Sequence, residues 1–227
     1  MIKRSLLLSL LAAGSVAAQA QTIPEKVKPY VETCAACHGA FGNLTKGIET
    51  DEQGNVKIVD NVLVAPEEAP QPKLAGQHAD YLYKQMRDFR MEGDKPPVRE
   101  NANMNAMIAV VPDEDLRAVA DYFAAQKLQP AAATNAETVA IGQKLWRAGD
   151  AARGIPACAG CHGPAGKGIP AQYPALAGQF PEYIAVQLRA FRDDVRQNDP
   201  ANMMRAIALR LTEPQIKAVS DYAAGLR

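Results

Sequence analysis

All four cysteines of this 227-residue chain lie in two copies of the pattern Cys-x-x-Cys-His. The copies are CAACH at residues 34–38 and CAGCH at residues 158–162, and they also contain two of the three histidines. Two thiols at this spacing can add across the two vinyl groups of one haem, and the adjacent histidine can then meet its iron. The sequence therefore predicts two covalently bound haem c groups. The attachment residues would be Cys34, Cys37, Cys158 and Cys161.

Other chemistries of paired cysteines fit the sequence less well. Four cysteines and two histidines could ligate zinc, but zinc does not require a histidine directly after each second cysteine. The even cysteine count also allows disulfides, yet bonds within 34–37 and 158–161 would close only very short loops. A thioredoxin-like Cys-x-x-Cys needs a βαβ context, which this sequence lacks. Haem attachment is the favoured interpretation, and zinc and disulfides are its alternatives.

Each haem iron needs two axial ligands, and we expect His38 and His162 to supply one apiece. A methionine thioether is the sixth ligand that raises the potential of a haem. Met104 and Met204 match each other in the two halves of the chain, eight residues before a predicted last helix. Methionine can also serve only to fill a hydrophobic core. If these two methionines did only that, each iron would lack a soft sixth ligand.

Three other side chains could compete for an iron. Met107 and Met203 lie close by, but their counterparts in the other half are Ile207 and Asn103, so matching the two halves rejects both. The remaining histidine, His78, could serve at most one haem. Because its counterpart is a phenylalanine, we expect an ordinary half-exposed residue at the start of a helix.

Two prolines are candidates for orienting the histidines. A ligating histidine usually donates its second ring N–H to a carbonyl or carboxylate, which fixes its orientation and basicity. Pro72 and Pro174 have a carbonyl but no backbone N–H, and their fixed φ angle holds that carbonyl in place. The alternative is that both prolines only start helices.

The elements that carry these residues are repeated. KLAGQ at 73–77 recurs as ALAGQ at 175–179, and YLYKQMRDFR at 81–90 recurs as YIAVQLRAFR at 183–192. Apolar residues in both copies recur at helical spacing. Each repeat has a start signal for a last helix. In the first repeat it is Pro112 with the acidic residues that follow it, and in the second it is Thr212 with Glu213 and Pro214. The chain is therefore expected to be all-α, with the same small helical domain used twice.

The domain boundaries follow from this repeat. We predict a first domain over 21–127, a linker over 128–136 that contains Pro130, and a second domain over 137–227. Residues 1–20 have the basic start, apolar run and small-residue cleavage signal of a secretory signal peptide. No later segment approaches the length of apolar sequence that spans a membrane. The mature protein is expected outside the cytoplasmic membrane, where haem is attached to c-type proteins.

The two repeats differ most between the attachment histidine and the Pro-x-Leu segment. The first repeat has 36 residues from His38 to Leu74, against 14 from His162 to Leu176 in the second. The extra segment, 43–64, alternates weakly around a Gly-Asn turn, which predicts a small β-hairpin. It could be a solvated loop or an element that docks a partner.

These motifs resemble the diheme cytochrome c4 family, in which one periplasmic chain holds two tandem class I cytochrome c domains related by internal pseudo-symmetry. The resemblance covers nearly the whole mature chain and departs from the family pattern in the 43–64 insertion and at Pro112. The matching segments are 34–39, 72–77, 81–90 and the helix of Met104, with 158–163, 174–179, 183–192 and 203–212 in the second repeat.

The resemblance implies the family's site residues and packing. It implies thioether bonds to the four cysteines, axial His38 and Met104 on one iron, and axial His162 and Met204 on the other. It also implies that the first and last helices of each domain cross. The contacts expected there are those of Gly142 and Trp146 with Tyr222, and of Tyr30 with Tyr122.

The charge of the chain is balanced overall but unequal between its halves. Residues 21–130 carry 12 Lys and Arg against 17 Asp and Glu, whereas residues 131–227 carry 11 against 8. Such a dipole can orient encounters with charged partners. The sequence has no concentrated basic patch of the kind that would indicate binding to nucleic acid. We expect redox proteins as partners, one donating and one accepting electrons, with a membrane oxidase complex among the candidates.

Electron transfer is the favoured function, because an iron saturated by histidine and methionine has no open position for a substrate. The expected role is a periplasmic shuttle between respiratory or dehydrogenase donors and a terminal oxidase. The alternative is a dedicated electron-accepting subunit of a periplasmic dehydrogenase, for instance a flavocytochrome sulfide dehydrogenase. A diheme redox enzyme is a third hypothesis, which the scarcity of further His and Cys disfavours.

Overall fold

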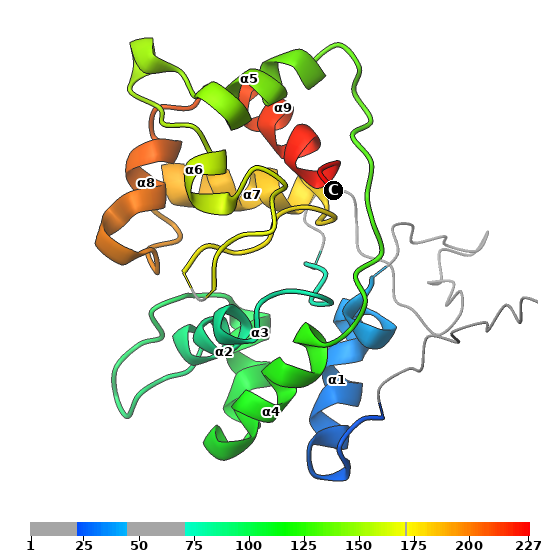
Figure 1. Cartoon of the computed structure of the whole chain (residues 1–227). Helices are drawn as coiled ribbons and strands as arrows, with labels where there is room; N and C mark the ends of the chain where they lie inside the picture. The colour runs from blue at the N-terminus through cyan, green and yellow to red at the C-terminus, as the bar shows by residue number, and fades with distance from the viewer. Residues whose placement is uncertain (1–21, 45–70, 171) are drawn as a thin grey trace, which may run out of the picture.

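The computed structural model describes residues 22–44, 71–170 and 172–227, and over these the chain is helical. The described residues contain isolated β-bridges but no strand, so the all-α prediction is confirmed. The predicted signal peptide and nearly all of the predicted hairpin lie outside the described residues. Figure 1 shows two helical bodies stacked on each other, α1–α4 in one and α5–α9 in the other, joined by an extended connection.

The first repeat is built on α1, α2, α3 and α4. Their bounds are α1 (Lys28–His38), α2 (Ala79–Asp88), α3 (Ala102–Ala109) and α4 (Asp113–Ala124). Val27 and Val31, at the beginning of the chain, pack with Val119, Tyr122 and Phe123 of α4. Burial of these apolar side chains holds η1 and the α1 residues of the cluster against the last helix, and Tyr30 joins Tyr122 in the same cluster as predicted.

The second repeat has the same order of long helices. Their bounds are α5 (Val139–Ala148), α6 (Ala159–His162), α7 (Pro181–Arg192), α8 (Met203–Ala208) and α9 (Glu213–Ala224). Trp146 and Tyr222 share its core cluster. Gly142 lies so close to α9 that an added Cβ would stand 2.3 Å from the Ala218 carbonyl oxygen. The predicted crossing of first and last helices is confirmed in the second repeat, where α5 packs along α9, whereas in the first repeat α4 packs mainly against η1.

Short 3-10 turns complete the described helical segments. They are η1 (Glu25–Val27), η2 (Ala40–Gly42), η3 (Ala151–Arg153) and η4 (Pro200–Asn202). The last helix begins after Pro112 in the first repeat and after Thr212 in the second, as the start signals predict. Thr212 forms a capping box with Gln215, whereas Pro112 makes no side-chain cap.

The two attachment motifs lie in different local structures, a difference that the repeated sequence pattern does not predict. In the first repeat the motif forms the end of α1. In the second, α5 ends at Ala148 and is capped by Gly149. A pair of backbone hydrogen bonds joins Asp150 to Ile155, and the motif follows at the short α6. Glycine is required at 149, since its φ is +69° and a Cβ would meet the Ile155 carbonyl oxygen at 2.2 Å.

Hydrogen bonds fix both ends of the connection between the repeats. At its beginning, the Asn43 side chain donates to the Lys127 carbonyl and accepts from the Gln129 N–H. At its end, the Asp221 carboxylate accepts from the backbone N–H groups of Thr134 and Asn135. The connection therefore follows the surface of both repeats.

Candidate haem sites

The four cysteines lie in one helical segment of each repeat. Cys34 and Cys37 stand one turn apart at the end of α1, and Cys158 and Cys161 bracket the start of α6. None forms a disulfide. Burial raises the pKa of the Cys34 thiol and of the Cys158 thiol to about 11. At neutral pH these free thiols are therefore protonated, which does not fit the thiolate of thioredoxin-like exchange.

The zinc alternative also lacks a ligand cluster. No group of three or more His, Cys, Asp or Glu side chains in the described part of the chain is arranged to hold a metal ion. That part includes every cysteine and histidine. Each repeat instead offers two thiols beside one histidine, the donor set expected of one haem c.

His38 and His162 are both almost fully buried, and each makes the predicted bond to a proline carbonyl. His38 Nδ1 lies 2.9 Å from the Pro72 oxygen, and His162 Nδ1 lies 3.0 Å from the Pro174 oxygen. Burial lowers the pKa of both imidazoles, against the smaller opposing effect of these bonds. A carbonyl can only accept, so Nδ1 carries the proton and Nε2 keeps the free lone pair that iron needs.

A glycine ends the helix directly after each histidine. Gly39 and Gly163 have φ values of +81° and +77°, a conformation that glycine adopts without strain. At Gly39 a Cβ would stand 2.6 Å from the backbone nitrogen of Leu44. The chain can therefore turn sharply after the motif while the imidazole stays in the interior.

Aromatic side chains surround the second histidine. The centre of the Trp146 ring lies 6.3 Å from that of His162, and the Tyr173 ring stands edge-on at 6.2 Å. Trp146 donates from Nε1 to the Pro164 carbonyl oxygen at 3.1 Å. This bond satisfies the polar atom of a fully buried indole and ties the first helix to the loop beyond the attachment motif.

The two methionines predicted as sixth ligands occupy similar environments. Met104, on α3, packs against the cluster of Phe89 and Leu116, and Met204, on α8, packs against the core of the second repeat. Asn101 caps α3 by accepting from the Met104 N–H at 3.0 Å. Met107 is 43% exposed, which disfavours it as an iron ligand. The comparison of the two repeats disfavours it as well.

His78 stands at the start of α2 and is half-buried, as predicted. Its Nε2 also lies 2.8 Å from the Lys167 carbonyl oxygen in the other repeat. This contact was not predicted, and neither were those of Gln77 and Gln179, whose side chains bond across the repeats. The sequence signal for the glutamines is their recurrence after Ala-Gly in both copies of the Pro-x-Leu segment.

Comparison with known proteins agrees with this geometry. The family model described as cytochrome c matches residues 26–127 and 139–226. Two helical cytochrome c domains, each with its own Cys-x-x-Cys-His motif, define a diheme c-type cytochrome, which binds haem c at Cys34 and Cys37 and at Cys158 and Cys161. This class of protein transfers electrons.

Two similar proteins indicate the family within this class. A cytochrome c4 from Azotobacter vinelandii is 41% identical over 201 residues, which cover 85% of this chain and 84% of the relative. A crystal structure of reduced recombinant cytochrome c4 from Pseudomonas stutzeri superposes with a TM-score of 0.73 at 33% identity, covering 93% of this chain and all of that one. The chain belongs to the cytochrome c4 family.

One further relative carries a different name. A thiosulfate dehydrogenase electron acceptor from Stutzerimonas stutzeri is 35% identical over 223 residues, which cover 96% of this chain and 90% of the relative.

Among the described residues, no helix is both long enough and apolar enough to cross a membrane.

Proposed function

We propose that each haem iron is held between a histidine and a methionine, His38 with Met104 and His162 with Met204. The observation that carries the proposal is the bond from each histidine to its own proline carbonyl, at 2.9 Å and 3.0 Å. The same His–Pro geometry occurs in both repeats although their sequences differ. It leaves Nε2 of each imidazole to bind iron.

A haem c with both axial positions filled accepts and releases one electron and has no open position for a substrate. The residues of the chain set the conditions for this exchange. Pro72 and Pro174 fix the rings of the histidines, and the apolar side chains around them exclude water. A dry site favours the less charged ferrous form, so burial raises the potential. We therefore propose electron transfer without a catalytic role.

We infer that the protein works in the periplasm as two haem domains, 21–127 and 137–227, with a linker at 128–136. The signal-peptide pattern of residues 1–20 supports export. The role as a shuttle between respiratory or dehydrogenase donors and a terminal oxidase is part of the same proposal. Its support is the family and the unequal charge of the two halves of the chain, which gives each domain a different electrostatic surface.

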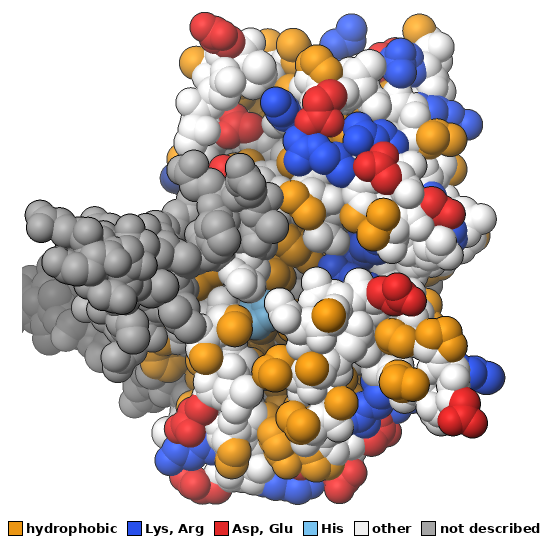
Figure 2. Space-filling model, turned by 180° about the vertical axis from the view of Figure 1, so that it is seen from behind, with side chains coloured by type: hydrophobic (Ala, Val, Ile, Leu, Met, Phe, Trp, Pro, Cys, Tyr) orange, Lys and Arg blue, Asp and Glu red, His pale blue; other side chains and the backbone are white. Residues whose placement is uncertain are grey.

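The surface offers both charged and apolar contacts to such partners. Figure 2 shows basic and acidic side chains interspersed over the body that contains α5–α9, with hydrophobic side chains scattered over the body below it. Exposed large apolar residues occur on both repeats, among them Met107 and Val110 on the first and Leu209 on the second. Charged groups of this kind steer encounter, and small apolar contacts suit short-lived complexes.

A second candidate is a dedicated electron acceptor of one dehydrogenase. The relative named as a thiosulfate dehydrogenase electron acceptor favours it. The two roles differ in selectivity: a dedicated acceptor is reduced quickly by one dehydrogenase and co-purifies with it, whereas a shuttle reacts with several donors. Rates of reduction by purified thiosulfate dehydrogenase and by a quinol-oxidising complex would separate them.

The proposal of two closed irons is tested on the purified wild-type protein. We expect two low-spin haems, the weak thioether-to-iron absorption band at the red end of the ferric spectrum, and no carbon monoxide binding at neutral pH. Rapid carbon monoxide binding by either haem would reject the proposal and favour a redox enzyme instead.

A further inference from the structure

One peptide group connects the histidine of the first repeat with a side chain of the second. The carbonyl of the Pro72–Lys73 peptide accepts from His38 Nδ1 at 2.9 Å. The N–H of the same peptide donates to Oε1 of Gln179, which belongs to the second repeat, also at 2.9 Å. The two ends of a single peptide dipole are thus bonded to a candidate iron ligand and to the opposite repeat.

The second repeat contains the same arrangement, with the roles of the two repeats exchanged. The carbonyl of the Pro174–Ala175 peptide accepts from His162 Nδ1 at 3.0 Å, and its N–H donates to Gln77 Oε1 at 2.9 Å. Gln77 belongs to the first repeat. Each histidine is therefore linked to the glutamine of the other repeat through one peptide group.

The orientation of both glutamine amides is determined by their partners. Gln77 donates from Nε2 to the Ala175 carbonyl at 3.0 Å, and Gln179 donates from Nε2 to the Lys73 carbonyl at 2.9 Å. Each Oε1 also accepts from the backbone N–H of the residue after it, at 3.1 Å and 3.0 Å. Exchanging oxygen and nitrogen would break all three bonds of an amide, so only one orientation fits.

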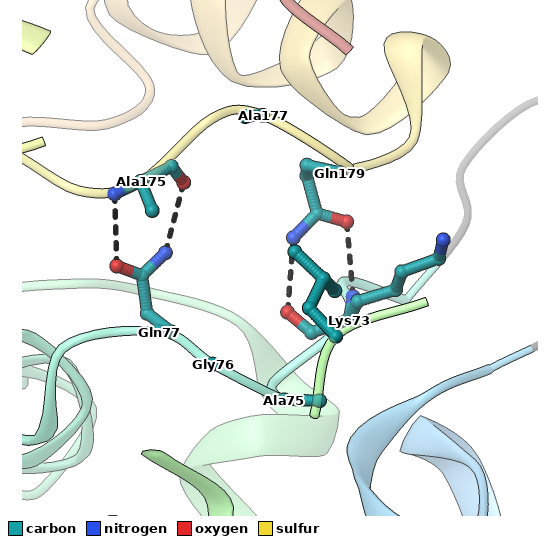
Figure 3. Close-up of a pocket in the computed structure, with 8 residues that line it drawn as sticks. Lys73, Ala75, Gly76, Gln77, Ala175, Ala177 and Gln179 are labelled. Carbon is teal, nitrogen blue, oxygen red and sulfur yellow. Dashed lines mark hydrogen bonds between the residues drawn. The ribbon is translucent and has the colours of Figure 1, made fainter. Parts of the chain in front are cut away.

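These bonds lie in a nearly dry interface. Figure 3 shows the two amides side by side, each paired with the backbone of the facing repeat. Gln77 and Gln179 are 8% and 7% exposed, and the cavity between them has a volume of about 10 Å³, the space of about one water molecule. Leu128 fills the neighbouring space against Gly76 and Gly178. Hydrogen bonds polarise one another more strongly in such surroundings than in water.

We propose that Gln179 is a positioning residue that tunes the haem of the first repeat, and that Gln77 tunes the haem of the second. When the Pro72–Lys73 N–H is bonded to Gln179, the peptide oxygen becomes more negative and accepts more strongly from His38. A stronger bond at Nδ1 makes the imidazole a more basic ligand, which favours ferric iron and lowers the potential. Docking of the two repeats thereby adjusts both haems. The inference rests on the proposed axial role of His38 and His162.

The test uses Gln179→Leu and Gln77→Leu in the full-length diheme protein. The midpoint potential of each haem is followed by NMR during a redox titration, because the methyl resonances of the two haems can titrate separately. In Q179L we expect the potential of the first haem to rise and that of the second to stay unchanged, and in Q77L the reverse. The Nδ1–H resonance of His38 in the ferrous protein should move upfield in Q179L, while that of His162 stays in place.

Gln179→Glu provides a second variant of the same length. Its carboxylate loses the bond from Nε2 to the Lys73 carbonyl but keeps the acceptor for the Lys73 N–H and strengthens it. The His38 Nδ1–H resonance should therefore move downfield, opposite to its direction in Q179L. If Q179L does not fold, the shift of the His38 Nδ1–H resonance in Gln179→Glu alone decides the proposal. A shift in the same direction in both variants, or no shift, would overturn it.

His78→Phe is the matched control. It removes another bond between the repeats, from His78 to the Lys167 carbonyl, and introduces the residue found at the equivalent position of the second repeat. It leaves both proline peptides bonded, so neither potential should move. Equal shifts of both haems in Q179L, or a shift of the second haem alone, would contradict tuning across the repeats. Failure of the axial assignment would show earlier, as carbon monoxide binding by the wild-type protein.

Discussion

Arg99 and Arg196 occupy equivalent places on the two sides of the contact between the repeats. Each guanidinium lies 4.5 Å from the centre of a phenylalanine ring in its own repeat. Both donate to the side-chain oxygens of the same two glutamines, Gln85 on α2 and Gln187 on α7, at 2.6–3.0 Å. The two arginines and two glutamines therefore form a closed network that joins the repeats.

Arg196→Met is expected to destabilise the protein through this network. Arg196 is 8% exposed, and its loss removes bonds to both glutamines and to the Tyr81 hydroxyl. Charge-assisted bonds contribute about 1.5–3 kcal/mol each before the cost of burying the charge, so we expect a loss of about 2 kcal/mol in unfolding free energy. Guanidinium chloride unfolding of the ferric protein measures it.

The control for Arg196 is Arg117→Met, whose guanidinium is 51% exposed and pairs with Asp80 and Asp121. Exposed ion pairs contribute about 0–1 kcal/mol. Equal effects of the two substitutions would show that the network between the repeats adds nothing to stability.

Met104→Ala and Met204→Ala should each open one iron. Loss of the thioether ligand is expected to lower the potential of the affected haem by on the order of 0.1–0.3 V, part of the roughly 0.8 V range that axial ligands span. Carbon monoxide should then bind to about half of the haem in either variant. Potentiometric titration and carbon monoxide difference spectra measure both effects.

The exposed Met107 supplies the comparison for these variants. Met107→Ala should leave both potentials and the closed spectrum unchanged, because its side chain is 43% exposed. An open haem in this variant, with Met104→Ala still closed, would assign the sixth ligand of the first haem to Met107.

Local signals predicted the features that lie within one repeat. The spacing of Cys34 and His38 and the fixed carbonyl of Pro72 are properties of short segments, and the starts of α4 and α9 follow from Pro112 and Thr212. Each of these depends on neighbouring residues and on the comparison of two copies. The helices and the His–Pro bonds could be predicted for that reason, whereas the crossing of first and last helices was implied only by the family resemblance.

Contacts between the repeats could not be predicted in the same way. Periodicity shows which face of α2 is apolar, but it does not show that Gln85 will meet Arg196 or that Gln77 will reach Ala175. Those pairs depend on how two folded bodies dock. The separation of α5 from α6 was also missed, although Gly149 and Pro156 mark the turn between them.

Gly142→Ala should destabilise the second domain, because its Cβ would stand 2.3 Å from the Ala218 carbonyl oxygen and 2.6 Å from the Tyr222 Cβ. Forcing α5 away from α9 is expected to cost about 1–3 kcal/mol. Gly160→Ala is the control, since a Cβ there meets nothing within 4 Å and alanine occupies the equivalent place in CAACH. Thermal unfolding should separate the two, and an unchanged midpoint for Gly142→Ala would mean that the two helices can move apart freely.

Asp121 and Asp221 are equivalent in sequence, but the structure gives them different roles. Asp221 is buried and accepts from the Thr134 N–H, the Thr134 hydroxyl and the Asn135 N–H at 2.8–3.1 Å. Asp121 is 53% exposed and pairs with Arg117. Asp221→Ala leaves the bonded N–H groups of the connection without their acceptor, which is expected to cost about 2–3 kcal/mol, whereas Asp121→Ala should cost less than about 1 kcal/mol.

Hydrogen exchange and chemical unfolding together test this difference. In Asp221→Ala the amides of Thr134 and Asn135 should exchange faster, because their acceptor is gone, while the amides of α4 keep their protection. Unchanged exchange at these two amides would show that the Asp221 carboxylate does not hold the end of the connection. Equal losses of unfolding free energy in the two aspartate variants would show that burial of the carboxylate makes no difference. A larger loss for Asp221→Ala, confined to the second repeat, is the outcome that its three hydrogen bonds require.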